Sequence, residues 1–133
     1  MAGIGRTVLT LRFYGDDLDP AKVTALIGAE PTKTELKGHV WPSGRVSKAG
    51  SWRLSVGDRE PGDLDGQIRE LFYGLTENLE VWADLSARYD GDLFCGLFME
   101  SSNEGLDLEP DTLAMIGSRG LRLGFDIYGP VED

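Results

Sequence analysis

The sequence predicts an α+β fold, with an antiparallel or mixed sheet of about five strands and with its helices mainly on one face. Segments in which apolar and polar residues alternate, typical of strands, are interspersed with segments in which apolar residues recur every three or four positions, typical of helices. The resulting order is β-α-β-β-α-β-α-β, which contains the ferredoxin-like βαββαβ series and adds one αβ unit. No stretch has the composition of a linker, so residues 1–133 form a single predicted domain, with an ordered core at about 7–129.

The chain starts with an alternating strand over 8–14, and a short amphipathic helix over 20–27 follows it. Asp19 is a suitable N-cap, and Pro20 suits the first helical position, where the missing N–H is no loss. Gly28 supplies the left-handed residue that often ends a helix. The residues at both ends and the apolar spacing between them therefore predict the same helix.

The next segments are more polar. Residues 30–37 predict an exposed edge strand, because lysines such as Lys33 and Lys37 protect an edge from pairing with other chains. The stretch 38–50 contains a proline, glycines and small residues, which predicts a flexible loop. A strand over 51–56 follows, with its large apolar residues on one face.

The second half of the chain begins with a long helical region. Two apolar groups, over 68–75 and 79–89, follow helical spacing, and the glycine between them predicts a kink or two consecutive helices. Residues 93–99 are apolar on both faces, which is typical of a central strand. A capped helix over 108–120 and an alternating strand over 121–128 complete the series.

A set of short motifs, considered in order, is more specific than any one of them. They are Phe13-Tyr14-Gly15-Asp16, Leu18-Asp19-Pro20, Gly50-Ser51-Trp52-Arg53-Leu54, Leu93-Phe94-Cys95-Gly96, Glu100-Ser101, Asn103, Gly105 and Asp126-Ile127-Tyr128-Gly129. Over residues 9–129 the chain resembles the bacterial family named domain of unknown function 4279. The resemblance implies a small bacterial protein of the cytosol, and it brings no catalytic residues with it.

Residues suited to catalysis at neutral pH are scarce, since the chain has one histidine and one cysteine. His39 lies in the predicted loop, and Cys95 lies in an apolar strand, where burial raises the pKa of a thiol. Two such side chains cannot build a zinc site, and no phosphate-binding glycine motif is present. We therefore expect no catalytic residues, no metal, no cofactor and no enzymatic activity.

The net charge of the chain limits the classes of partner that it is expected to bind. Acidic residues outnumber basic ones by 23 to 13, for a formal net charge of -10. A negative surface repels phosphate backbones, so we expect no nucleic-acid binding. The sequence has no apolar signal core at its start and no run of about 18 apolar residues, so we expect no membrane contact and a cytoplasmic location.

Acidic residues follow two of the predicted strands. Asp16 and Asp17 come after the first strand, and Asn103, Glu104 and Asp107 come after the strand over 93–99. If these strands lie adjacent and parallel, both loops emerge at one edge of the sheet. An acidic patch there would steer a basic protein partner, so the leading hypothesis is a non-enzymatic protein-binding module, for instance of inhibitor or immunity type. A bound hard cation, or solvated turns with helix caps, are the other readings of these loops.

Three further hypotheses stay open. A small-ligand-binding domain or weak enzyme would use a pocket of Trp52, Glu100, Asp126 and Tyr128. A structural oligomerisation module would form a homodimer through the edge strand at 31–37. A basic strip over 33–53 could hold an anion or could only protect the edge. Its members are Lys33, Lys37, Arg45, Lys48 and Arg53.

Overall fold

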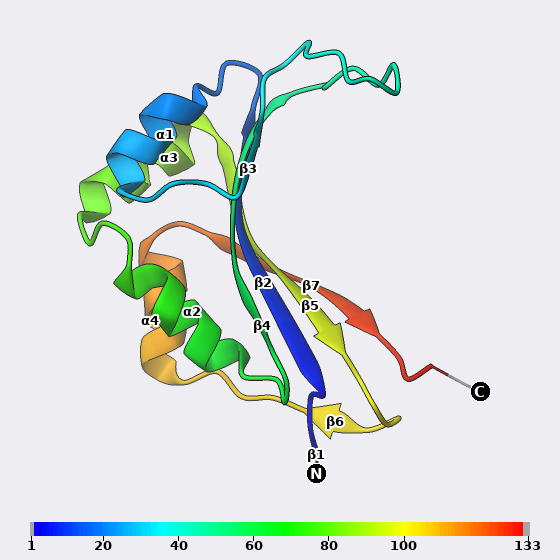
Figure 1. Ribbon diagram of the computed structural model, residues 1–133. Helices are drawn as coiled ribbons and strands as arrows, with labels where there is room; N and C mark the ends of the chain where they lie inside the picture. The colour runs from blue at the N-terminus through cyan, green and yellow to red at the C-terminus, as the bar shows by residue number, and fades with distance from the viewer. Residues whose placement is uncertain (1, 132–133) are drawn as a thin grey trace.

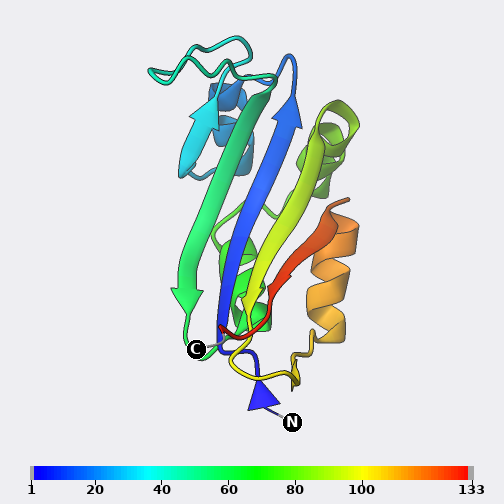
Figure 2. The same cartoon turned by 90° about the vertical axis from the view of Figure 1, so that its right-hand side faces the viewer.

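Four helices lie on one side of a five-stranded sheet within residues 2–131, which the computed structural model describes (Figure 1). No helix within residues 2–131 lies on the other face of the sheet, which we call the helix-free face and which faces the viewer in Figure 2. The elements in chain order are β1 (Ala2–Gly3), β2 (Arg6–Gly15), α1 (Pro20–Ile27), β3 (Lys33–Glu35), β4 (Gly50–Arg59), α2 (Leu64–Tyr73), α3 (Leu79–Arg88), β5 (Asp90–Phe98), β6 (Glu104–Gly105), α4 (Pro110–Ser118) and β7 (Arg122–Tyr128). The predicted α+β class is therefore confirmed.

The strand order of the main sheet is β3-β4-β2-β5-β7, so β2 occupies the centre. It is antiparallel to both of its neighbours, β4 and β5, whereas β5 and β7 are parallel, which makes the sheet mixed. The segments β1 and β6 form a separate two-stranded parallel ribbon at one end of the molecule, which the sequence pattern did not predict. The finer assignment to the ferredoxin-like series stays a prediction.

Local signals set the helix boundaries. The Asp19 side chain accepts a hydrogen bond from the backbone N–H of Ala21 at 3.1 Å, and Pro20 begins α1. Gly28 ends this helix in the left-handed conformation, with φ of 86°. The long helical region is two consecutive helices, α2 and α3, and the Asn78 side chain caps the second by accepting from the Glu80 N–H at 3.0 Å.

The core lies between the sheet and the helices. Phe13 is fully buried there, with its ring centroid 6.2 Å from that of Trp52 and 6.4 Å from that of Trp82. Cys95 also faces this layer, and burial raises the pKa of its thiol to about 12. A thiol held neutral in this way is a packing residue and a poor nucleophile.

The stretch 38–50, predicted as a flexible loop, folds back on itself in a hairpin-like excursion, and its flexibility stays a prediction. The backbone N–H of Gly38 donates to the Ser47 carbonyl at 2.8 Å, and Val40 and Val46 form an antiparallel bridge. The Glu35 carboxylate lies beneath it and accepts from the Ser47 hydroxyl at 2.9 Å and from Arg45 at 3.1 Å. Glu35 therefore joins two side chains of the excursion to the edge of the sheet.

Candidate functional site

The two acidic loops lie at opposite ends of the molecule. Strands β2 and β5 are adjacent, as expected, but antiparallel, so the expectation that both loops share one edge is wrong. Asp16 and Asp17 follow the end of β2 next to α1, whereas Asn103, Glu104 and Asp107 follow the opposite end of the sheet. A strand of this length spans about 30 Å, so these side chains do not form one patch.

The acidic side chains that make contacts do so locally. The Asp16 carboxylate accepts from the Lys37 ammonium at 2.9 Å, and the Glu104 carboxylate accepts from the backbone N–H of Glu100 at 2.8 Å. Among the residues that the structure describes, no three His, Cys, Asp or Glu side chains come together in a group that could hold a metal ion. A basic protein partner for either loop stays a prediction.

The four residues of the predicted ligand pocket are also divided. Trp52 is fully buried on the helix side of the sheet, where its indole N–H donates to the Thr24 hydroxyl at 3.0 Å. Asp126 and Tyr128 are exposed on the helix-free face, with the Tyr128 hydroxyl 3.4 Å from the Asp126 carboxylate. Glu100 is exposed just beyond β5, at the same end of the sheet as Tyr128. The structure thus brings Asp126 and Tyr128 together and separates Trp52 from them.

A row of five charged residues crosses the whole sheet on its helix-free face. The strand registers pair them in sequence, one from each strand: Lys33 of β3, Arg53 of β4, Arg12 of β2, Asp92 of β5 and Arg122 of β7. We call this set the charged row. Side chains alternate between the two faces of a strand, and the residues on either side of Arg12 are buried among the helices, so the row points away from them. Four cations therefore lie beside one carboxylate.

Two cations of the charged row already have a carboxylate partner: Lys33, whose ammonium lies 3.7 Å from Glu35, and Arg12. Arg12 donates from Nε and Nη2 to the two carboxylate oxygens of Asp92, at 2.8 and 2.7 Å. This hydrogen bonding raises the pKa of Arg12 above its ordinary value. The guanidinium also lies 4.3 Å from the centroid of the Phe94 ring. Arg12 is held in one orientation, and its charge is largely neutralised by Asp92.

Arg53, like Arg122 at the other end of the row, has no counter-charge among the described residues. It makes no ion pair with the described residues, and its Nε is buried without a hydrogen-bond partner among them. Its guanidinium carbon lies 5.6 Å from the centroid of the Tyr14 ring. The Arg53 charge is therefore balanced by no carboxylate and only partly by the Tyr14 ring.

A shallow depression of about 300 Å³ surrounds Arg53. Its lining, all on the helix-free side, comprises Thr10, Arg12, Thr32, Lys33, Arg53, Ser55 and Phe94. We call it the basic depression, because these residues include three cations and no carboxylate. The hydroxyls of Thr10 and Ser55 are 2.9 Å apart, and the Thr32 hydroxyl accepts from the backbone N–H of Ser55 at 2.9 Å. Such a set of donors suits an oxyanion.

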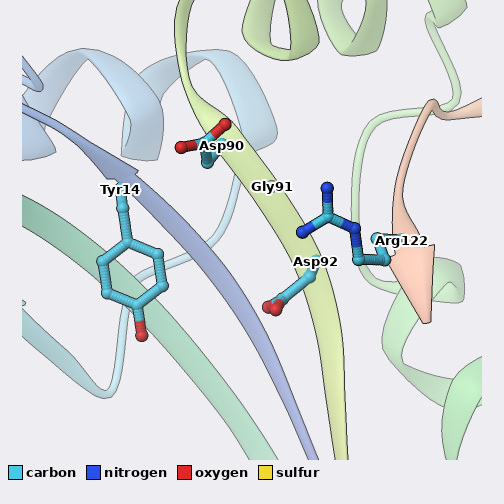
Figure 3. A pocket seen from close by; sticks show the side chains of 5 residues that line it. All are labelled: Tyr14, Asp90, Gly91, Asp92 and Arg122. Atoms are coloured by element: carbon cyan, nitrogen blue, oxygen red, sulfur yellow. The ribbon is translucent and has the colours of Figure 1, made fainter. Parts of the chain in front are cut away.

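A second depression, of about 340 Å³, adjoins the charged row at its β5–β7 end. Tyr14, Asp90, Gly91, Asp92 and Arg122 line it, and Figure 3 shows the Arg122 side chain reaching from β7 across β5. The lining includes two carboxylates and one guanidinium. This depression is therefore of mixed charge, unlike the one around Arg53.

Only part of the charged row was visible as a pattern in the sequence. The basic strip over 33–53 included Lys33 and Arg53, but its other members lie elsewhere: Lys37 pairs with Asp16, Arg45 pairs with Glu35, and Lys48 is exposed. The row also depends on Arg12 and Arg122, which are alternate polar positions of strands far apart in the chain. The signal that could have found them is the polar face of each strand, once the register is known.

Two findings concern the chain as a whole: the length of its helices and its similarity to known proteins. No helix within residues 2–131 has the length and apolar character needed to cross a membrane. No curated protein and no solved structure matches the chain. A family model does match, over a segment that runs from the first residue of β2 to just beyond β7 and so contains the entire main sheet. That model is described as a domain of unknown function (DUF4279), and because it matches residues 6–130, the chain belongs to this family.

Proposed function

We propose that this protein is a small-ligand-binding module that recognises an anionic group, of phosphate or carboxylate type, in the basic depression. The single observation that carries the proposal is the placement of Arg53 directly opposite Arg12 on one side and Lys33 on the other. Like charges opposite one another on a sheet are destabilising. In a chain with a net charge of -10, three neighbouring cations are not a product of composition.

The chemistry of the depression favours an oxyanion. A planar guanidinium offers parallel N–H donors that match the spacing of two oxygens in a carboxylate or phosphate. Because Asp92 holds Arg12 and the Lys33 ammonium lies 3.7 Å from Glu35, the Arg53 guanidinium is the free donor of the depression. An anion in the depression would accept hydrogen bonds from the terminal N–H groups of the Arg53 guanidinium and would relieve the repulsion across the row.

The charge distribution also favours a small ligand over a polyanion. The net charge of -10 repels an extended phosphate backbone, whereas a small anion meets only the local field of the depression. The earlier hypothesis of a basic partner receives less support from the geometry, because the acidic residues that would form its patch lie at two ends of the molecule. No enzymatic step is proposed.

Titration with inorganic phosphate and with pyrophosphate, followed by the amide shifts in ¹H–¹⁵N NMR spectra, tests this function. We expect shifts centred on Thr10, Arg12, Arg53 and Ser55. A hydrogen bond to a charged group contributes about 1.5–3 kcal/mol, so Arg53→Met should weaken binding by about tenfold or more. Lys48→Met is the matched control, because it removes the same charge from an exposed site outside the depression.

Two outcomes of this titration would contradict the proposed anion binding. Equal weakening by Arg53→Met and Lys48→Met would show that only the general charge of the protein matters, and the proposal would be wrong. An absence of shifts on the helix-free face with both anions would also overturn it. Circular dichroism of Arg53→Met verifies the fold, and we expect the unliganded variant to be at least as stable as the wild type, because the cross-strand repulsion is removed.

A further inference from the structure

The outer edge of β7 is an unpaired strand edge. Within residues 2–131, β7 pairs with β5 on one side and with no strand on the other. The Tyr128 carbonyl accepts from the Met99 N–H at 2.9 Å, so the peptide groups of Tyr128 face β5. Peptide groups alternate in direction along a strand, so those of Leu123, Phe125 and Ile127 point to the free edge. The chain after β7 turns towards the helix-free face and does not pair with this edge, and α4 lies alongside β7 in the helix layer (Figure 2).

Apolar side chains accompany the free peptide groups. Phe125 and Ile127 are 42 % and 63 % exposed, although their strand positions place them on the helix side of the sheet. The helix α4 packs against β7 but does not cover these two side chains. An exposed apolar strand edge is a template for pairing with another chain, and proteins normally protect it.

The sequence of β7 is complementary to itself. We propose that two copies of this chain pair through β7 in antiparallel orientation, about a two-fold axis at Gly124. In this register Arg122 of each copy lies opposite Asp126 of the other, and Leu123 lies opposite Phe125. Both ion pairs fall on the helix-free face and both apolar pairs on the helix side, as the alternation of the strand requires.

The hydrogen-bond pattern fits the same register. The outward peptide groups of Leu123 and Phe125 face each other across the axis and form hydrogen-bonded pairs, while Gly124 meets its own copy in a non-hydrogen-bonded pair. In such a pair the strands approach most closely, so the side chains of Arg122 and Asp126 come within reach. Arg122 leans over β5 in Figure 3, and because both side chains are exposed, a change of rotamer suffices to turn them to the edge.

The opposite edge of the sheet fits a partner strand less well. The strand β3 has three residues, Lys33–Glu35, and the Lys33 ammonium at its start lies 3.7 Å from Glu35. A short strand with a lysine is one of the ways in which proteins protect an edge. Dimerisation through residues 31–37 stays a prediction, and the seven residues of β7 make the stronger candidate.

Sedimentation equilibrium of the full chain, in phosphate-free buffer at about 0.15 M salt, tests the β7 dimer. We expect a wild-type dimer. Arg122→Glu places two carboxylates opposite each other at both symmetric positions, and Asp126→Arg places two guanidiniums there. Each variant alone should therefore weaken the dimer by about tenfold or more. An equimolar mixture of the two variants should restore it, because both cross-strand pairs are then of opposite charge.

Lys48→Glu is the control, since it makes the same charge change as Arg122→Glu at an exposed site away from β7, and it should leave the dimer intact. A wild-type monomer at high concentration would overturn the inference. A dimer that neither variant weakens, or a mixture that fails to associate while the wild type does, would overturn this register. Recovery in the mixture excludes misfolding as the cause of the loss in either variant.

Discussion

At the scale of single residues, Gln67 shows how a polar side chain is stabilised in the core. It is fully buried, and its amide nitrogen donates to the carbonyls of Thr7 at 3.0 Å and of Gly57 at 2.9 Å. Its amide oxygen accepts from the Thr7 hydroxyl at 2.6 Å, and that hydroxyl accepts from the Asp63 N–H at 2.9 Å. One side chain of α2 thereby joins the helix to both β2 and β4.

Replacing Gln67 with leucine should therefore lower the free energy of unfolding by about 2–3 kcal/mol, because several buried groups lose their partners. Urea denaturation followed by tryptophan fluorescence measures this change. Tyr73→Leu is the control on the same helix, since Tyr73 is 94 % exposed, and its effect should stay within about 0.5 kcal/mol. Equal stability of Gln67→Leu and wild type would show that the hydrogen bonds contribute nothing net.

Glu35 has a comparable role beneath the hairpin over 38–50. The hydrogen bond from Arg45 lowers the pKa of Glu35 below its ordinary value of 4.5; burial opposes this, and Ser47 and Lys33 add to the lowering. A carboxyl whose pKa is lowered by folding stabilises the folded state above its unfolded pKa, and this contribution is lost as the pH falls through the folded value.

The stability difference between wild type and Glu35→Gln should consequently be largest at about pH 7, and it should shrink as the pH falls through the lowered pKa of Glu35 and the carboxyl becomes neutral. Urea denaturation across this range gives the difference directly. The exposed Glu80→Gln provides the background change expected for a carboxyl at the surface. If the wild type keeps its advantage over Glu35→Gln at the acidic end, the charge of Glu35 does not account for its contribution.

At the scale of elements, local signals determined where helices begin and end. The N-cap Asp19, the first-turn Pro20 and the terminal Gly28 of α1 all occupy the predicted positions. These signals could be found in the sequence because a cap acts on backbone groups within a few residues of itself. The hairpin form of residues 38–50 could not be found in this way, because it depends on Glu35, which binds side chains ten and twelve residues further along.

Two glycine substitutions should have effects of opposite sign. Gly28 ends α1 with φ of 86°, and a Cβ there would touch nothing, so Gly28→Ala should cost about 1–2 kcal/mol for the backbone conformation alone. Gly117 lies within α4, where a Cβ also meets nothing, so Gly117→Ala should raise stability by about 0.5–1 kcal/mol. Thermal denaturation of both variants measures the pair, and a shift in the same direction for both would contradict this account.

At the scale of the whole molecule, the pairing of strands decided what the sequence could predict about the site. The class, the number of strands and the side that carries the helices follow from periodicity, which each segment contains by itself. The direction of β5 relative to β2 does not follow from periodicity. For this reason the expectation that the loops of Asp17 and Glu104 lie at one edge of the sheet was wrong. The charged row is absent from any local pattern for the same reason, because its residues come from five strands.

The central position of β2 has a consequence for how the chain folds. Its partners begin at Gly50 and at Asp90, so neither of its edges can pair with a strand until much of the later sequence is present. Contacts between such distant segments require large loops to close first, which slows folding. On the ribosome the apolar side of β2 therefore emerges long before the strands that flank it, and until they are made it stays open to aggregation.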